Sequence, residues 1–233
     1  MKNLFLTRFV TVGLMLAVLL SGCGKRRSTT SQTAFPEDEK EYILAIVFDL
    51  SGSFVQLMAE DGRAYDFAMQ VVDRYHRNTI GTRDKLVIAQ ISGTQRSLLW
   101  EGTPLQLRHQ FPTAASFREF LLSKADPNGS LVNDGLAHVV NYLTADPQVS
   151  GGHAKLGLFV LSDMLDSGPN PEESQKRLVQ SLSVLGLTDS LIGMYFVDQL
   201  LVAYWKQQLQ AAGLRRYHVE SEIVGKPLLP ELE

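Results

Sequence analysis

The chain contains a single cysteine, Cys23, among its 233 residues. A disulfide within the chain is therefore excluded, even if the protein is exported to an oxidising compartment. The folded part must instead be stabilised by the burial of apolar side chains.

Long apolar runs are also scarce, and the longest, at 10–20, follows a basic start and precedes small residues. This pattern is typical of a secretory signal, and the run falls short of the roughly 20 residues that span a bilayer. The segment 20–23, Leu-Ser-Gly-Cys, resembles the bacterial lipobox. We predict that 1–22 is a lipoprotein signal peptide and that Cys23 carries lipid, such as palmitate. The alternative is an unmodified thiol in a leader that is merely cleaved.

The stretch 23–41 is polar and almost free of large apolar residues, so we predict a flexible tether. Its basic residues 25–27 either lie near anionic head groups or are simply solvated. Gly24 follows the cysteine, where the enterobacterial signal for inner-membrane retention would have Asp. We therefore expect a lipid-anchored protein of the bacterial cell envelope, on the periplasmic face of the outer membrane rather than at the inner membrane.

Positive charge is in slight deficit, with 22 Lys and Arg against 25 Asp and Glu and a formal net charge of −3. Removal of the leader takes away Lys2 and Arg8 but no acid, which leaves 20 basic against 25 acidic residues. A nucleic-acid partner requires a concentrated basic face and is not expected.

Several enzyme signatures are missing. The sequence has no Gly-x-Gly-x-x-Gly after a strand and no P-loop, which removes the fingerprints of dinucleotide and nucleoside-triphosphate binding. It has no Gly-x-Ser-x-Gly elbow, and its five histidines lack zinc-ligand spacing. With no catalytic motif found, we predict a protein that is not an enzyme.

From 42 to 224 the chain alternates short β-branched runs with longer amphipathic stretches. This alternation predicts one domain of the α/β class with a mostly parallel, doubly wound sheet flanked by helices. The predicted strands are 42–49, 85–91, 97–101, 156–162, 190–197 and 217–223. The predicted helices are 63–78, 113–124, 133–144, 172–185 and 199–212. The prolines of the tail, 225–233, prevent regular structure there.

Polar side chains follow the first predicted strand as Asp49-Leu50-Ser51-Gly52-Ser53. A carboxylate and two hydroxyls at alternate positions can converge on one hard cation. Asp163 ends another strong strand, and parallel sheets bind ligands beyond the carboxyl ends of their strands. The sequence therefore predicts a divalent-metal site at this edge.

These residues resemble the von Willebrand factor type A (vWA) domain, whose metal-ion-dependent adhesion site has an Asp-x-Ser-x-Ser loop, a threonine and a later aspartate. Asp49, Ser51 and Ser53 fit the first part, and Asp163 fits the last, although methionine follows it where the family often has glycine. Ser130 stands where the threonine is expected and keeps the hydroxyl. The resemblance covers roughly 42–224.

The resemblance implies that Mg²⁺, or Mn²⁺, binds through the three serines and through waters held by the two aspartates. An open position on the ion would then take an Asp or Glu of a protein partner. The chain would thus be an adhesion or scaffold module.

Other interpretations stay open. A phosphatase-like hydrolase could use the same ion. Such enzymes have a second aspartate two residues after the first, where this chain has Ser51. Asp49, Ser51 and Ser130 could cap helices, Ser53 and Asp163 could be ordinary loop residues, and Asp134 and Asp166 are interpreted as helix-start and loop acids. A metal-free envelope scaffold is a third possibility. We expect the loops that set specificity around the rim to include 93–112 and 144–154, although packing beneath the sheet edge is the favoured use of their aromatic and aliphatic side chains.

Overall fold

The computed structural model describes residues 41–52, 54–59, 62–79, 84–92, 96–126, 131–224 and 227–228. The predicted leader, the tether with Cys23 and most of the tail lie outside these residues, as do Ser53 and Ser130.

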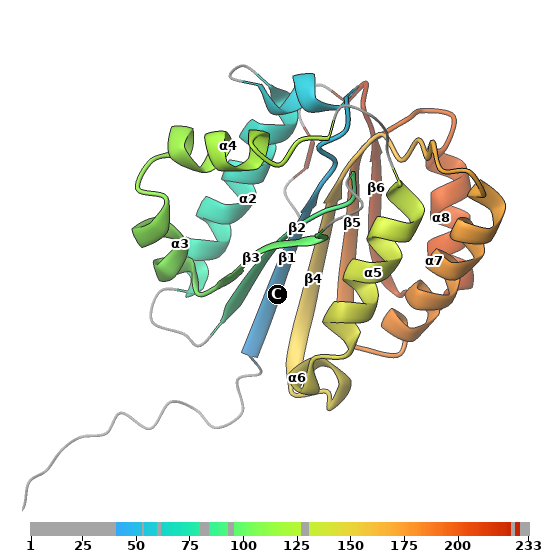
Figure 1. The fold of residues 1–233 in the computed structure, drawn as a ribbon. Helices are drawn as coiled ribbons and strands as arrows, with labels where there is room; N and C mark the ends of the chain where they lie inside the picture. The colour runs from blue at the N-terminus through green and yellow to red at the C-terminus, as the bar shows by residue number, and fades with distance from the viewer. Residues whose placement is uncertain are drawn as a thin grey trace, which may run out of the picture. The chain divides into compact units, whose positions relative to one another are not determined.

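The domain is built on a six-stranded sheet with the strand order β3-β2-β1-β4-β5-β6 (Figure 1). All neighbouring pairs are parallel except β2 and β3, which are antiparallel. The predicted α/β class with a mostly parallel, doubly wound sheet is confirmed. The strands are β1 (Glu41–Phe48), β2 (Lys85–Gln90), β3 (Leu98–Gly102), β4 (Ala154–Leu161), β5 (Ser190–Val197) and β6 (Arg216–Ser221).

Helices cover both faces of the sheet. Figure 1 shows α2, α3 and α4 on one side and α5, α7 and α8 on the other. A one-turn 3-10 helix, η1, follows the first strand, and α6 lies beside the start of β4. The helices are η1 (Val55–Met58), α2 (Arg63–Thr79), α3 (Pro104–Gln110), α4 (Ala114–Leu122), α5 (Val132–Thr144), α6 (Pro147–Ser150), α7 (Pro171–Leu185) and α8 (Val202–Ala211).

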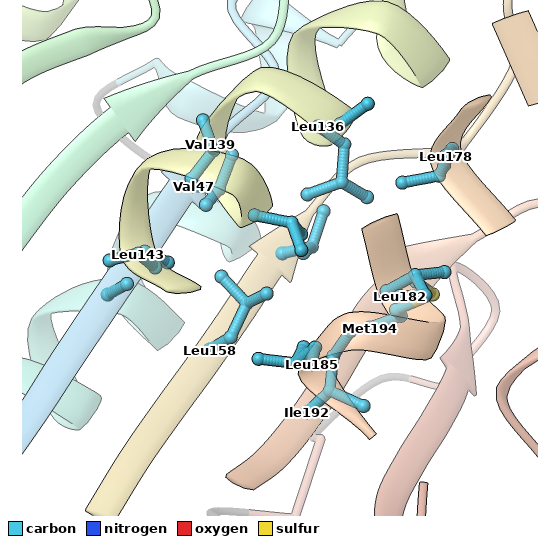
Figure 2. Close-up of a cluster of buried hydrophobic side chains, with 14 of the residues drawn as sticks. Val47, Leu136, Val139, Leu143, Leu158, Leu178, Leu182, Leu185, Ile192 and Met194 are labelled. Atoms are coloured by element: carbon cyan, nitrogen blue, oxygen red, sulfur yellow. The ribbon is translucent and has the colours of Figure 1, made fainter. Parts of the chain in front are cut away.

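Successive residues of the central strands face opposite layers, as the pleat of a strand requires. Val47 of β1 and Leu158 of β4 pack against α5 and α7 in one cluster, shown in Figure 2. Ile46 and Phe48 of β1 pack in a second cluster under α2 and α4. Strands β1 and β4 are therefore buried on both faces, as their continuous apolar runs predict.

All the predicted strands and helices are present, with ends shifted by no more than three residues. Two α-helices of the described residues, α3 and α6, were not predicted, and neither was the 3-10 helix η1. Both α-helices begin with a proline after a side-chain cap, Thr103 for α3 and Asp146 for α6. Their short length conceals any apolar period, so the cap was the signal that could have found them.

The prediction that 93–112 and 144–154 shape the rim is wrong for most of both stretches. Strand β3 runs antiparallel to β2, with Gly102 beside Leu86, so it carries the chain away from the carboxyl ends. Helix α6 precedes β4 and lies at that same far end of the sheet (Figure 1).

None of the helices in the described part of the chain is both long enough and apolar enough to cross a membrane.

Candidate metal site

Asp49 lies directly beyond β1, between the ends of β2 and β4. Its backbone N–H donates to Leu161 O of β4 at 2.9 Å, so the β1–β4 pairing continues into this residue. The residue is fully buried. A buried carboxylate requires hydrogen-bond donors around it, and the structure provides two.

The two donors occupy the two oxygens of the Asp49 carboxylate. Ser51 N–H donates to Oδ1 at 2.9 Å, and Ser162 Oγ donates to Oδ2 at 2.7 Å. Ser162 is itself fully buried, and its oxygen accepts from Met164 N–H at 2.9 Å. Sequence reasoning missed Ser162. Its only signal was its place directly before a strand-end aspartate.

The loop after Asp49 is held by two further segments. Leu50 N–H donates to Ser92 Oγ beyond β2 at 3.0 Å, and Leu50 O accepts from Asp126 N–H at 3.1 Å. Ser51 and Asp126 form an isolated parallel β-bridge. Ser51 is buried in consequence, and the loop is fixed from both sides.

Asp163 follows β4 at the same edge of the sheet. The pairing of Phe48 with Leu161 places the ends of β1 and β4 side by side, so Asp49 and Asp163 are brought together across 114 positions of sequence, as predicted. Asp163 is partly exposed, and its Oδ1 accepts from Leu165 N–H at 2.9 Å.

The backbone conformation of Met164 is one that suits glycine, the residue that vWA domains often have after this aspartate. Its φ of 61° lies in the left-handed region that glycine adopts without a steric penalty. The conformation that a glycine would accommodate is therefore present here with methionine in it.

Of the predicted metal ligands, Asp49, Ser51 and Asp163 lie at one edge of the sheet, and Ser53 and Ser130 are outside the described residues. No group of three or more His, Cys, Asp or Glu in the described part of the chain could hold a metal ion. A cation would therefore depend on hydroxyl and water oxygens beside two carboxylates, a donor set that suits Mg²⁺.

The idea that Asp49 or Ser51 caps a helix is wrong. The N-cap residue of η1 is Phe54, which makes no side-chain cap hydrogen bond. The Asp49 carboxylate instead accepts from within its own loop and from Ser162.

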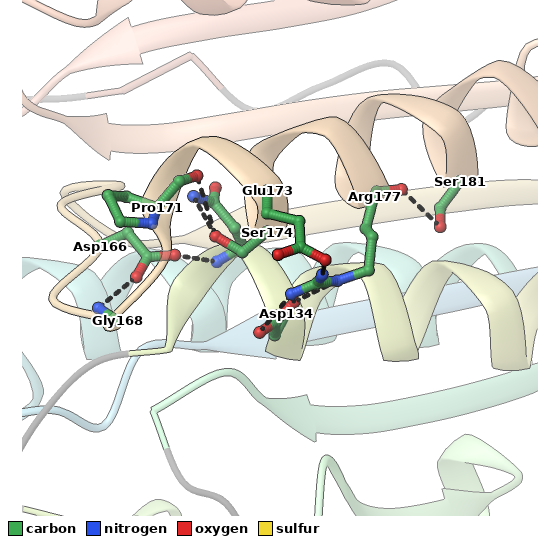
Figure 3. Close-up of polar contacts among 9 residues, drawn as sticks. Asp134, Asp166, Gly168, Pro171, Glu173, Ser174, Arg177 and Ser181 are labelled. Atoms are coloured by element: carbon green, nitrogen blue, oxygen red, sulfur yellow. Dashed lines mark hydrogen bonds and ion pairs between the residues drawn. The ribbon is translucent and has the colours of Figure 1, made fainter.

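The two other acids near this edge have structural partners, which Figure 3 shows. Asp166 Oδ2 accepts from Asn133 N–H at 2.9 Å, at the start of α5. Asp134 accepts from the guanidinium of Arg177 on α7 at 2.9 Å. Their interpretation as loop and helix-start acids is confirmed, and they tie α5 to α7 and its preceding loop.

The sequence matches no protein-family model and no curated protein. The structure is similar to the pilus adhesin SpaC from Lactobacillus rhamnosus GG, with a TM-score of 0.53, 12% sequence identity and 79% of this chain covered. The fold is vWA-like. Proximal thread matrix protein 1 from the mussel byssus also matches, with a TM-score of 0.42, 15% identity and 78% coverage.

The chain spans 28% of the SpaC chain and 44% of the mussel chain. At these identities the likeness is one of fold. Within this vWA-like fold, Asp49, Ser51 and Asp163 occupy the carboxyl edge of the sheet, where β1 and β4 end side by side.

Proposed function

We propose that this protein is a lipid-anchored module of the bacterial cell envelope that binds a protein partner through a divalent cation. The ion would be Mg²⁺ or Mn²⁺, held by Asp49, Ser51, Ser53, Ser130 and Asp163. Lipid on Cys23 would tether the domain, with the periplasmic face of the outer membrane as the proposed location.

The observation that supports this proposal most directly is the fixed carboxylate of Asp49 beside Asp163. Both oxygens of Asp49 accept hydrogen bonds from neutral donors, so the orientation of the buried carboxylate is fixed. Hydrogen bonding of this kind is what a ligand that holds a metal or its waters needs.

The donor set also suits a site that remains open to a partner. Two aspartates balance the two positive charges of the ion, and serine hydroxyls add none. The ion would therefore remain electrophilic enough to coordinate a carboxylate of another protein. Mg²⁺, when bound, supplies this Lewis acidity. A protein Asp or Glu is the proposed ligand.

Calorimetric titration with MgCl₂ tests the site. The protein for this test is the full chain with Cys23→Ser, which cannot carry lipid. We expect Asp49→Ala to abolish magnesium binding, and Asp73→Ala, which removes an exposed acid on α2, to leave it unchanged. Unchanged magnesium affinity in Asp49→Ala would refute the site.

Fractionation tests the anchor separately. We expect the unmodified chain in the membrane fraction of a bacterial host and the Cys23→Ser chain in the soluble periplasmic fraction. Identical fractionation of the two chains would contradict lipidation at Cys23.

Assay of model phosphate esters separates binding from hydrolysis. We expect no turnover that depends on Mg²⁺. Turnover that requires the ion and disappears in Asp49→Asn would replace the binding function by a hydrolase function at the same residues.

A further inference from the structure

Three large aliphatic side chains stand exposed beyond three adjacent strands. Leu165 follows β4, Leu200 follows β5 and Ile223 follows β6, with exposed fractions of 51%, 87% and 64%. The strands are parallel neighbours, so all three residues lie at the carboxyl edge that carries Asp49 and Asp163. We call these three residues the apolar ridge.

The same type of hydrogen-bonded turn holds the backbone of each residue of the ridge. The backbone N–H of Leu165 donates to Asp163 Oδ1 at 2.9 Å, and that of Leu200 donates to Asp198 Oδ1 at 2.8 Å. Ile223 N–H donates to Ser221 Oγ at 3.3 Å. In each case a side chain accepts from the backbone two residues later, which fixes a tight turn.

Backbone hydrogen bonds also join the three turns to one another. Asp198 N–H donates to Asp163 O at 2.9 Å, and Glu222 N–H donates to Val197 O at 3.0 Å. The turns therefore form one connected surface. Because these turns are already ordered, this protein would lose little conformational entropy when a partner covers them, which favours binding.

The ridge adjoins the proposed metal site, because Asp163 is a proposed ligand and its Oδ1 also accepts from the backbone N–H of Leu165. Neighbouring strands lie about 4.8 Å apart. The turns after β4, β5 and β6 therefore form a row that starts at Asp163 and that a short peptide could cover. A protein segment that places a carboxylate on the ion and runs from there toward β6 would pass over the ridge. Exposed apolar groups that cluster at one edge are typical of interaction sites.

The charge around the ridge selects among possible occupants. Asp163, Asp198 and Glu222 lie in the same turns, so the surface repels an anionic bilayer and nucleic acid alike. Away from the cation, it favours a partner surface that is apolar and free of further acids.

We propose that the apolar ridge binds large apolar side chains that flank the partner's carboxylate. This inference rests on the proposed metal-dependent function. The partner segment would contain one Asp or Glu for the ion and a bulky aliphatic or aromatic residue nearby for Leu165, Leu200 and Ile223.

Selection from a phage-displayed library of random peptides tests the proposal, with the full-length Cys23→Ser protein as bait in magnesium buffer. We expect the enriched peptides to share an acidic residue and a large apolar residue within about four positions of each other. We expect EDTA to release these peptides. The consensus peptide then serves as the probe for titrations.

The titrations compare ridge variants with a matched control. We expect Leu200→Ser to weaken binding of the consensus peptide about tenfold, with smaller losses for Leu165→Ser and Ile223→Ser. Leu187→Ser is the control, because Leu187 has the same exposed fraction, 87%, and precedes β5 at the opposite edge. Magnesium affinity should be the same in all four variants.

Equal peptide affinity in wild type and all three ridge variants would overturn the inference while leaving the metal site intact. The same conclusion follows if a protein that binds magnesium enriches only acidic peptides without an apolar residue, or enriches none. Apolar peptides that bind the ridge and resist EDTA would uphold the ridge and contradict metal dependence.

A lipid surface is the other occupant that the experiment distinguishes. Vesicles of phosphatidylethanolamine and phosphatidylglycerol should not bind the Cys23→Ser protein. Vesicle binding that Leu200→Ser abolishes would show that the ridge contacts a bilayer, and would overturn the proposal of a protein partner.

Discussion

Ser162 Oγ donates a hydrogen bond of 2.7 Å to Asp49 Oδ2, which joins the ends of two strands across 113 positions of sequence. The same hydroxyl oxygen accepts from Met164 N–H in the turn that follows Asp163. Ser162 therefore connects the two aspartates of the candidate site. It fixes the orientation of one carboxylate and the turn beside the other.

Removal of this hydroxyl should weaken magnesium binding. We expect Ser162→Ala to lower magnesium affinity by about tenfold to a hundredfold, because a hydrogen bond to a charged group contributes about 1.5–3 kcal/mol. Ser162→Thr keeps the hydroxyl and should restore most of the affinity in the same calorimetric titration.

The control for a general effect of truncating a buried serine is Ser190→Ala, at the start of β5 and far from the site. It should lower stability slightly and leave magnesium affinity unchanged. Ser162→Ala with the affinity of wild type would show that Ser162 has a structural role only.

The left-handed backbone of Met164 predicts an inverted order of glycine and alanine. Both substitutions remove a buried side chain and are destabilising, but at φ 61° alanine retains a Cβ penalty that glycine lacks. Met164→Gly should therefore be about 1 kcal/mol more stable than Met164→Ala in urea denaturation. At Val184, an exposed helical residue of α7, alanine should be the more stable by a similar amount. The same order at both positions would contradict strain at Met164.

Asp166 should contribute more to stability than the neighbouring ion pair between Asp134 and Arg177. Its two oxygens accept from Asn133 N–H at 2.9 Å and Gly168 N–H at 2.6 Å, so it caps α5 from a separate loop. We expect Asp166→Ala to lower the free energy of unfolding by about 1–2 kcal/mol. Asp134→Ala breaks a solvent-exposed pair with Arg177 and should cost about half a kcal/mol or less. A larger loss in Asp134→Ala, measured by denaturation in urea, would reverse this ranking.

Asp146 should make part of the stability dependent on pH. Burial by itself raises the pKa of this carboxyl, but the Gln148 N–H and the Lys85 ammonium, 3.0 Å from Oδ2, outweigh burial and lower the pKa below its usual value. A carboxyl with a lowered folded-state pKa stabilises the fold above its unfolded pKa of about 3.9, and this contribution is lost as the pH falls through the folded value.

We therefore expect Asp146→Asn to lower the free energy of unfolding by about 1 kcal/mol near pH 6. Asparagine can still cap α6, so the difference isolates the charge. The gap between variant and wild type should shrink as the pH falls below about 4. Asp73→Asn, which removes the charge of an exposed pair with Arg77, serves as the control and should show a small gap throughout. A gap at Asp146 that does not change with pH would contradict the prediction.

The elements of the fold were predictable because their signals are local. The runs around Ile46 and Leu158 are apolar at nearly every position, which only a strand covered on both faces requires. Asp49 and Asp163 could be placed together from the same reasoning, since both directly follow such strands. Helices α3 and α6 were missed because they are too short to show a period.

The antiparallel direction of β3 removes most of 93–112 from the carboxyl edge. Its signal was the short connection from β2, because a parallel neighbour needs a crossover of about a dozen or more residues. The contacts of Ser92 and Ser162 could not be predicted, because a buried serine has no sequence pattern that identifies its distant partner.

The class of fold, the order of its strands along the chain and the acids at the ends of β1 and β4 all follow from local sequence patterns, because the period of apolar side chains is a property of neighbouring residues. Tertiary structure alone decided that Ser162 holds Asp49, that Met164 adopts a left-handed backbone, and that Leu165, Leu200 and Ile223 share one edge. These relationships arise only when separate strands pack side by side, since packing sets which distant groups must satisfy one another's hydrogen bonds.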